Sequence, residues 1–272
     1  MLVNGKPEDQ IPLSDRGLQY GDGLFETMAV MQGRPCLWQR HMDRLARGEM
    51  ALGLPPSDKQ QLEQEALTLS AGHDQAVLKI ILTRGSGGRG YASPSPSAPR
   101  RLITIHPWPD YPQRWYSDGI RLGICRTRIG RNRQLAGHKH LNRLEQVLAR
   151  SECQEASLDE CLMMDEREQV ICGTQSNLFL LQKNTIYTPD LTHSGIAGVV
   201  RELVIETAQQ LSIPLLITHL DRDSLRDADA LFMTNSVMGL CPVAMLEQRQ
   251  YDLDAVPREL SRRVQEACTA SQ

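Results

Sequence analysis

Hydrophobic and polar positions alternate over short stretches in the first hundred residues, as half-buried β-strands require. Residues 25–38, 76–85 and 100–107 carry this pattern, and the dipeptides Asn4-Gly5 and Gln32-Gly33 are typical of tight turns between strands. Apolar residues recur every three or four positions in 38–52 and again after Asp58, which predicts two helices. The first region is therefore expected to mix strands and helices.

Prolines at 107, 109 and 112 interrupt the pattern, since regular structure does not continue through such a run. We expect residues 108–118 to connect an N-terminal α/β domain, 1–107, to a C-terminal domain, 119–272. In the second region the patterns predict a helix near Lys139 and two more at 197–211 and from about Val256. Strands are predicted at 120–129, 159–165, 170–182, 185–189, 217–220 and 229–234. The fold class is thus α/β (α+β).

Composition excludes several classes of protein. The formal net charge of −3 gives no reason to expect a nucleic-acid or anionic-membrane partner. No apolar run approaches the roughly 20 residues that span a bilayer, and no signal segment is visible, so we expect a cytoplasmic protein. The seven cysteines are scattered without a CxxC pair, which indicates reduced thiols, mostly in the core, and no metal site.

Lys139 is unusual among the basic residues, because only five of the 30 are lysines. It lies between His138 and His140, where a glycine precedes the predicted helix, with Arg143 four residues on. A helix N-terminus and basic neighbours both disfavour the protonated amine, and a neutral amine can form a Schiff base. The alternative is a solvated basic helix face. In that case the apolar residues Leu141, Leu144, Val147 and Leu148 would pack inward.

A lysine that holds an aldehyde cofactor needs a phosphate site as well. Gly195 and Gly198 precede a predicted helix, so the amides of Val199 and Val200 are candidates for binding a phosphate. A second candidate follows a predicted strand, at Thr234, Asn235 and Ser236. Taken alone, the glycine pattern is equally typical of an ordinary glycine-rich helix entry. The group at 234–236 is by itself only a weak indication of a phosphate site.

Six motifs taken together make the chain recognisable. In order, they are SDRGLQYGDGLFET, RHMDRL, LTRGSGGRGY, GHKHLNRLEQVLAR, GTQSNLFL and GVVREL. This combination resembles the class IV family of pyridoxal-phosphate enzymes, which includes branched-chain and D-amino-acid aminotransferases. RGSGGRGY and AGHKHLNRLEQVLAR are most similar to members that convert 4-amino-4-deoxychorismate to 4-aminobenzoate and pyruvate for folate synthesis.

The resemblance implies a small N-terminal α/β domain, a larger C-terminal domain with a barrel-like sheet, pyridoxal 5'-phosphate as cofactor and a homodimer. It makes Lys139 the Schiff-base lysine and Asn177 a polar neighbour of the cofactor. The residues that it assigns to the phosphate are Arg44, Val199, Val200 and Ser236. The residues that it assigns to the substrate are Arg89 for a carboxylate, Phe25 and Trp108 for the pocket, and Arg84 in reserve.

One position departs from the family pattern. Where the family carries a glutamate that pairs with the pyridine nitrogen, this chain has Cys172, and Glu168 is four residues upstream. A thiol offers at most a weak hydrogen bond there, so the cofactor should be a weaker electron sink. Alternatively, Cys172 is simply a small core residue. We expect a lyase, with a class IV aminotransferase as the alternative and a homologue that has lost its chemistry as a third reading.

Overall fold

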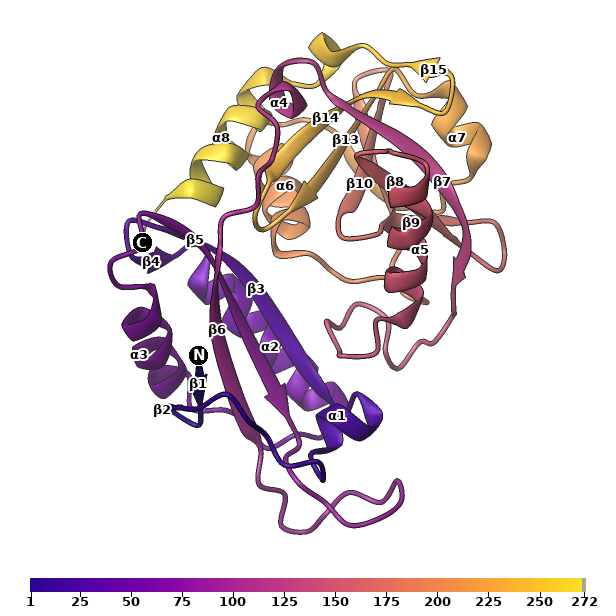
Figure 1. The fold of residues 1–272 in the computed structure, drawn as a ribbon. Helices are drawn as coiled ribbons and strands as arrows, with labels where there is room; N and C mark the ends of the chain where they lie inside the picture. Colours follow the sequence, from indigo (N-terminus) through magenta and orange to yellow (C-terminus); the bar gives the residue numbers. More distant parts are fainter. Residues whose placement is uncertain (271–272) are drawn as a thin grey trace. The chain divides into compact units, whose positions relative to one another are not determined.

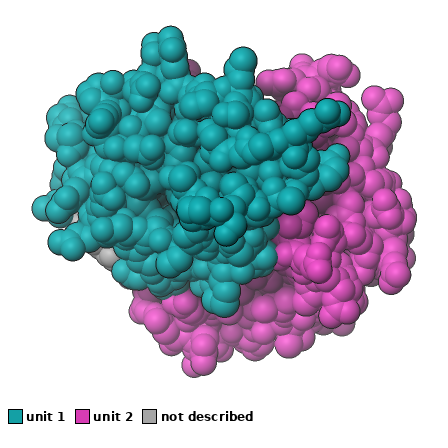
Figure 2. Space-filling model, turned by 90° about the horizontal axis from the view of Figure 1, so that it is seen from below, with its two compact units in different colours: residues 1–109, 138–142, 268–272 teal, residues 110–137, 143–267 magenta. Residues whose placement is uncertain are grey.

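The computed structural model describes residues 1–270, and its chain divides into two compact units (Figure 2). The first unit contains Met1–Pro109, His138–Asn142 and the described residues from Cys268 to Ala270. The second contains Asp110–Gly137 and Arg143–Ala267. The first unit thus ends two residues beyond the expected boundary at 107. It also takes in Lys139, which the sequence placed with the C-terminal region.

The first unit is built on one antiparallel sheet of six strands in the order β2-β1-β6-β5-β3-β4 (Figure 1). Its strands are β1 (Leu2–Val3), β2 (Lys6–Pro7), β3 (Gly23–Met31), β4 (Arg34–Pro35), β5 (Gln75–Thr83) and β6 (Arg100–Pro107). Its helices are α1 (Arg16–Tyr20), α2 (Trp38–Leu52) and α3 (Lys59–Ser70). The predicted strands and both long helices of this region are confirmed.

The core of this unit follows directly from the period of two along its strands. Alternate residues of β3 and β5, such as Met28 and Ile80, are fully buried and point to one face of the sheet. Helices α2 and α3 pack on that face through residues that include Met42 and Leu62. Several of the intervening residues, among them Phe25 and Thr27, are half-buried on the other face.

The second unit is built on a nine-stranded mixed sheet. Its strands are β7 (Ile120–Ile129), β8 (Glu160–Asp165), β9 (Val170–Gly173), β10 (Asn177–Gln182), β11 (Thr185–Pro189), β12 (Leu215–Thr218), β13 (Ala230–Asn235), β14 (Gly239–Leu246) and β15 (Arg249–Gln250). Its helices are α4 (Arg114–Ser117), α5 (Leu144–Glu155), α6 (Val199–Gln210), α7 (Arg222–Asp227), the 3₁₀ turn Leu253–Ala255 and α8 (Arg258–Thr269), whose last residues belong to the first unit. The mixed α/β fold class with a curled sheet is confirmed.

Strands β10 and β13 lie at the centre of this sheet and bring Phe179 opposite Phe232. The two rings stack with their centroids 4.9 Å apart, and both side chains are fully buried. Burying such a pair stabilises the fold both by removing apolar area from water and by the contact between the rings. The sheet centre that carries Asn177 and Thr234 is therefore well packed.

The proline-rich connector contains a short helix, which the sequence reading excluded. The last of its prolines is Pro112, and α4 begins two residues later, where nothing prevents helical backbone. Trp115 of α4 packs in the core of the second unit, and its indole N–H donates to Asp159 at 3.0 Å. Residues 110–118 therefore belong to the second unit.

The helix predicted around Lys139 begins later than expected. Helix α5 starts at Leu144, so Lys139 lies five residues before its first turn and outside the field of its N-terminus. The predicted inward face is also wrong. Leu144, Val147 and Leu148 are 70%, 58% and 54% exposed, and the helix packs through Ala149 and Cys153 instead.

The remaining predictions from composition have simple outcomes. All seven cysteines are free and buried, as the sequence predicts. Among residues 1–270, no helix has the length and apolar character needed to cross a membrane.

Candidate active site

Lys139 is held by backbone pairing at the beginning of β3. The Phe25 N–H donates to the Lys139 carbonyl at 2.9 Å, and the Leu141 N–H donates to the Gly23 carbonyl at 3.0 Å. The Lys139 Nζ lies over the Phe25 ring, 4.2 Å from its centroid. The structure thus brings two of the predicted site residues, Lys139 and Phe25, into contact in the first unit.

Glu26, next to Phe25 on β3, is fully buried and neutralised by α2. Arg44 donates to both of its carboxylate oxygens, and His41 Nδ1 lies 2.6 Å from Oε2. Burial alone would raise the pKa of Glu26, but the charge and hydrogen bonds of Arg44, with those of His41, lower it to about 2. Arg44, predicted to bind a phosphate, is therefore oriented by a carboxylate that the sequence reading did not single out.

His41 keeps one buried nitrogen without a hydrogen bond to any described residue, its Nε2. Burial is the main cause that lowers its pKa, so the ring is neutral at pH 7. With Nδ1–H donating to the Glu26 carboxylate, Nε2 is left as an acceptor. The charge of Lys139 reaches this ring and contributes to the lowered pKa.

Lys79 is a second amine at the same place; it lies within the predicted strand 76–85 and was not among the predicted site residues. Its Nζ lies 5.5 Å from the centroid of the Phe25 ring. Lys79 pairs with Thr27 on β3, and Phe25 pairs with Ile81, so Lys79 and Phe25 share one face of the sheet. The alternation of Lys79 with buried Leu78 and Ile80 is the signal that could have placed it there.

The two arginines of RGSGGRGY differ sharply in their surroundings. Arg84 is buried, and its guanidinium donates to Asp22 and to the carbonyls of Leu52 and Gly53. It is therefore a structural residue, which removes the reserve candidate for substrate binding. Arg89 is exposed and makes no ion pair with any residue in 1–270, so its guanidinium is available to a ligand.

Trp108 lies away from Phe25 along the sheet. Pro107, which precedes it, pairs with Ala76, whereas Phe25 pairs with Ile81. Five residues of β5 correspond to about 17 Å. The structure does not bring this predicted pocket residue to the Lys139 segment.

In the second unit, Asn177 joins the central strands to the start of α6. It pairs with Thr234 across the sheet, and its side-chain amide donates to the Ile196 carbonyl at 2.9 Å. A Cβ on Gly198 would lie 2.0 Å from the Asn177 Oδ1, so only glycine fits there. The first amides of α6, those of Val199 and Val200, follow directly and have no side-chain cap.

The end of β13 adds hydroxyl groups to this region. Thr234 is buried, and its Oγ1 makes no hydrogen bond to any described residue. Ser236 follows in the turn after β13 and is half-buried. Uncapped amides and an orphan hydroxyl are groups that suit a phosphate, so the chain's residues fit a phosphorylated cofactor.

Gly137, two residues before Lys139, pairs with Ile196 just before α6.

Cys172 lies in an apolar cluster with Cys125, Cys153 and Cys161. Burial raises the pKa of its thiol to about 12, with a further contribution from the charge of Glu160 and an opposing one from Arg143. Cys172 is thus a neutral thiol at pH 7. Glu168 cannot replace the missing family glutamate, because it is exposed and paired with Arg128.

Glu160 is the buried carboxylate of this region, and the sequence reading missed it. It accepts hydrogen bonds from the backbone of Thr174 and Gln175 and from the hydroxyls of Thr174 and Ser176. These contacts fix the turn between β9 and β10, so that the predicted single strand 170–182 is two strands. The turn places Asn177 at the start of β10.

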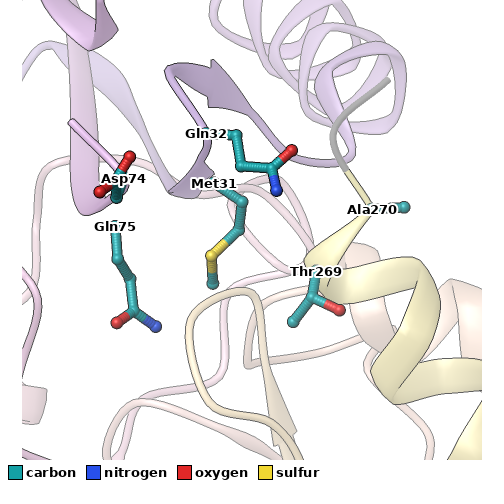
Figure 3. Close-up of a pocket in the computed structure, with 6 residues that line it drawn as sticks. All are labelled: Met31, Gln32, Asp74, Gln75, Thr269 and Ala270. Atoms are coloured by element: carbon teal, nitrogen blue, oxygen red, sulfur yellow. The ribbon is translucent and has the colours of Figure 1, made fainter. Parts of the chain in front are cut away.

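Figure 3 shows a surface pocket of about 620 Å³. It lies at the end of β3, whereas Lys139 pairs with the start of that strand. Its lining residues are Met31, Gln32, Asp74, Gln75, Thr269 and Ala270. Met31 is six residues from Phe25, about 20 Å along the strand. None of the predicted site residues lines it, so it is not the candidate site.

The chain is similar to known proteins over nearly its whole length. Residues 23–246 match the model of the family described as amino-transferase class IV. An aminodeoxychorismate lyase of Vibrio harveyi is 35% identical over 263 residues, 97% of each chain. A D-alanine aminotransferase of Bacillus licheniformis is 26% identical, over 98% of this chain and 95% of its own.

Among solved structures, 4-amino-4-deoxychorismate lyase from Pseudomonas aeruginosa superposes with a TM-score of 0.91. The two chains are 44% identical, and the match covers 97% of this chain and 96% of the other.

We predict that Glu26→Gln lowers the free energy of unfolding at pH 7 by about 3–5 kcal/mol, because it leaves Arg44 buried without its counter-charge. The Glu26 pKa of about 2 lies below its ordinary 4.5, so its contribution is complete above pH 4.5 and is lost as the pH falls toward 2. Denaturant unfolding at several pH values should show a weaker acid dependence in the variant. Glu63→Gln, at an exposed position on α3, is the control. An equal effect of both substitutions would contradict the prediction.

Proposed function

The chain belongs to the class IV family of pyridoxal-phosphate enzymes, and we propose that it converts 4-amino-4-deoxychorismate to 4-aminobenzoate and pyruvate. The observation that carries the proposal is the Lys139 amine over the Phe25 ring, in a chain 35% and 44% identical to two such lyases. The reaction would serve folate synthesis.

The proposed cofactor site uses groups from named elements. Lys139 would bind the cofactor's aldehyde, while Arg44, the amides of Val199 and Val200, and Ser236 would hold its phosphate. Asn177 fixes the start of α6 through the Ile196 carbonyl and thereby orients these amides. When bound, the cofactor supplies an electron-withdrawing ring.

The proposed chemistry at this chain's residues is a proton transfer followed by elimination. With the cofactor in place, Lys139 Nζ would act as a base and take the proton from the substrate ring carbon that bears nitrogen. The bond from the neighbouring carbon to the enolpyruvyl oxygen then breaks, the substrate ring becomes aromatic, and pyruvate forms after protonation. Arg89, with its unpaired fork, is suited to a substrate carboxylate, and Lys79 adds a second cation near Phe25.

We also propose that the chain works as a homodimer in the cytoplasm. Three neighbouring apolar side chains of α5, Leu144, Val147 and Leu148, are exposed, and apolar patches of this kind mark contact surfaces. Seven buried free thiols suit a reducing compartment.

We predict that the purified protein with pyridoxal phosphate releases pyruvate and 4-aminobenzoate in equal amounts from 4-amino-4-deoxychorismate. Lys139→Ala should abolish both the turnover and the visible absorbance of the bound cofactor. Lys139→Arg should fail equally, since a guanidinium neither condenses with an aldehyde nor accepts a proton at neutral pH. Near-normal turnover by either variant would remove Lys139 from the mechanism. Absence of both products from the unaltered chain would reject the lyase.

Replacing Arg44 or Ser236 should weaken retention of pyridoxal phosphate more than it slows turnover at saturating cofactor. One lost charge-assisted hydrogen bond to phosphate corresponds to about tenfold in the dissociation constant, which equilibrium dialysis can measure. Unchanged cofactor affinity in both Arg44→Lys and Ser236→Ala would reject these phosphate ligands. Thr68→Ala, at an exposed position on α3 in the first unit, is a control.

An aminotransferase remains the second candidate, favoured by the relatives of that activity. With a neutral thiol at Cys172, we predict negligible transamination of D- or L-alanine, which depends on a strong electron sink. Cys172→Glu should raise the lyase rate and make slow amination of the cofactor detectable by absorbance. Cys172→Gln, similar in size and uncharged, is the matched control. Equal rates in the two variants would show that charge at this position does not control how strongly the cofactor withdraws electrons.

A further inference from the structure

The motif SDRGLQYGDG remains without a role after the site has been described. It forms α1 and the turns on both sides of it, and α1 lies at the same end of the six-stranded sheet as the loop between β5 and β6 (Figure 1). That loop contains RGSGGRGY and carries Arg89. The side chains of the motif contact the loop directly.

Arg16 is the central contact. Its side chain is buried, with the whole residue only 3% exposed. Its guanidinium donates to three consecutive loop carbonyls, those of Gly90 at 3.0 Å, Tyr91 at 2.9 Å and Ala92 at 3.2 Å. Its Nε donates to Asp22 at 2.8 Å, which fixes the plane of the fork. A lysine has one nitrogen and cannot reproduce this pattern.

The base of the loop is held by the same motif. The Arg16 N–H donates to the Gly85 carbonyl, and the Gly87 N–H donates to the Ser14 carbonyl. A Cβ on Gly87 would lie 2.9 Å from Arg16 Cδ, so the loop passes the arginine where a larger residue would crowd it. Both sides of the loop tip are thus tied to residues 14–16. Between the ties, Gly88 and Arg89 are exposed.

We propose that Arg16 is a positioning residue that holds Arg89 ready for a carboxylate of the substrate. The inference rests on the proposed function, which gives Arg89 that ligand. A glycine-rich segment loses much conformational freedom when it is ordered, and pinning it in advance removes that cost from binding. The loop leaves β5 at Thr83, which pairs with Gly23, the residue whose carbonyl receives the N–H of Leu141 in the Lys139 segment. Arg89 is therefore carried at the end of the sheet that holds Lys139.

The test is a double-mutant cycle between Arg16→Lys and Arg89→Ala, measured in steady-state turnover of 4-amino-4-deoxychorismate. Arg16→Lys should raise KM about tenfold with kcat within about twofold, and it should leave the cofactor absorbance unchanged. In the Arg89→Ala background it should change KM no further. Independent effects of the two substitutions, or a loss confined to kcat, would overturn the proposal. Arg101→Lys is the matched control, because the Arg101 guanidinium donates to the Glu65 carboxylate outside the loop. This variant should keep its KM.

A second measurement does not depend on the substrate. Hydrogen exchange of the amides in residues 86–92 should become about tenfold faster in Arg16→Lys than in the unaltered holoenzyme. Gly87→Ala, which keeps Arg16 but crowds its side chain, should accelerate exchange in the same residues. Unchanged exchange in both variants would reject the clamp even if the lyase activity is found. Absence of product from the unaltered enzyme would reject the proposed function, while faster exchange would still show that Arg16 holds the loop.

Discussion

Two backbone hydrogen bonds at the start of β3 determine where Lys139 lies. The chain leaves the first unit after Pro109, builds a long strand of the second, and returns for five residues before leaving again. During that return, the carbonyl of Lys139 and the N–H of Leu141 pair with Phe25 and Gly23. A side chain on a segment that is hydrogen-bonded to a strand is positioned more accurately than one on a loop. This suits an amine that must meet one reacting carbon.

Buried and half-buried carboxylates organise the surroundings in both units. In the first, Glu26 orients Arg44 and His41, and Asp22 joins Arg16 to Arg84. In the second, Glu160 collects the donors of the turn between β9 and β10. Each of these carboxylates is matched by several donors, so its charge is compensated locally. The groups left for a ligand are amides, hydroxyls and cations, as an anionic cofactor and substrate would require.

Local pattern predicted much of the fold, because the period of two in β3, β5 and β6 reflects which face of the sheet is buried. The same kind of pattern misled near Lys139. Leu141, Leu144 and Leu148 have helical spacing. However, Leu141 pairs with the start of β3 and lies outside the helix, and Leu144 and Leu148 are exposed. Strand β14 was not predicted. It is held by pairing with β13 and with β7, which is far away in the sequence, so its place depends on the topology of the sheet. Motifs made Lys139 and Arg89 candidates, whereas Glu160 and Lys79 acquire their places only from contacts made far along the chain.

The return of the chain for residues 138–142 has a consequence for how the protein is made. Translation proceeds at about 5–20 residues per second, so the 33 residues from Pro109 to Asn142 take roughly 2 to 7 s to emerge. During that interval the six-stranded sheet can form, but the start of β3 still lacks its last neighbour. A nascent chain that stalls before Asn142 therefore presents unsatisfied N–H and C=O groups at Gly23 and Phe25, an edge open to pairing with another chain.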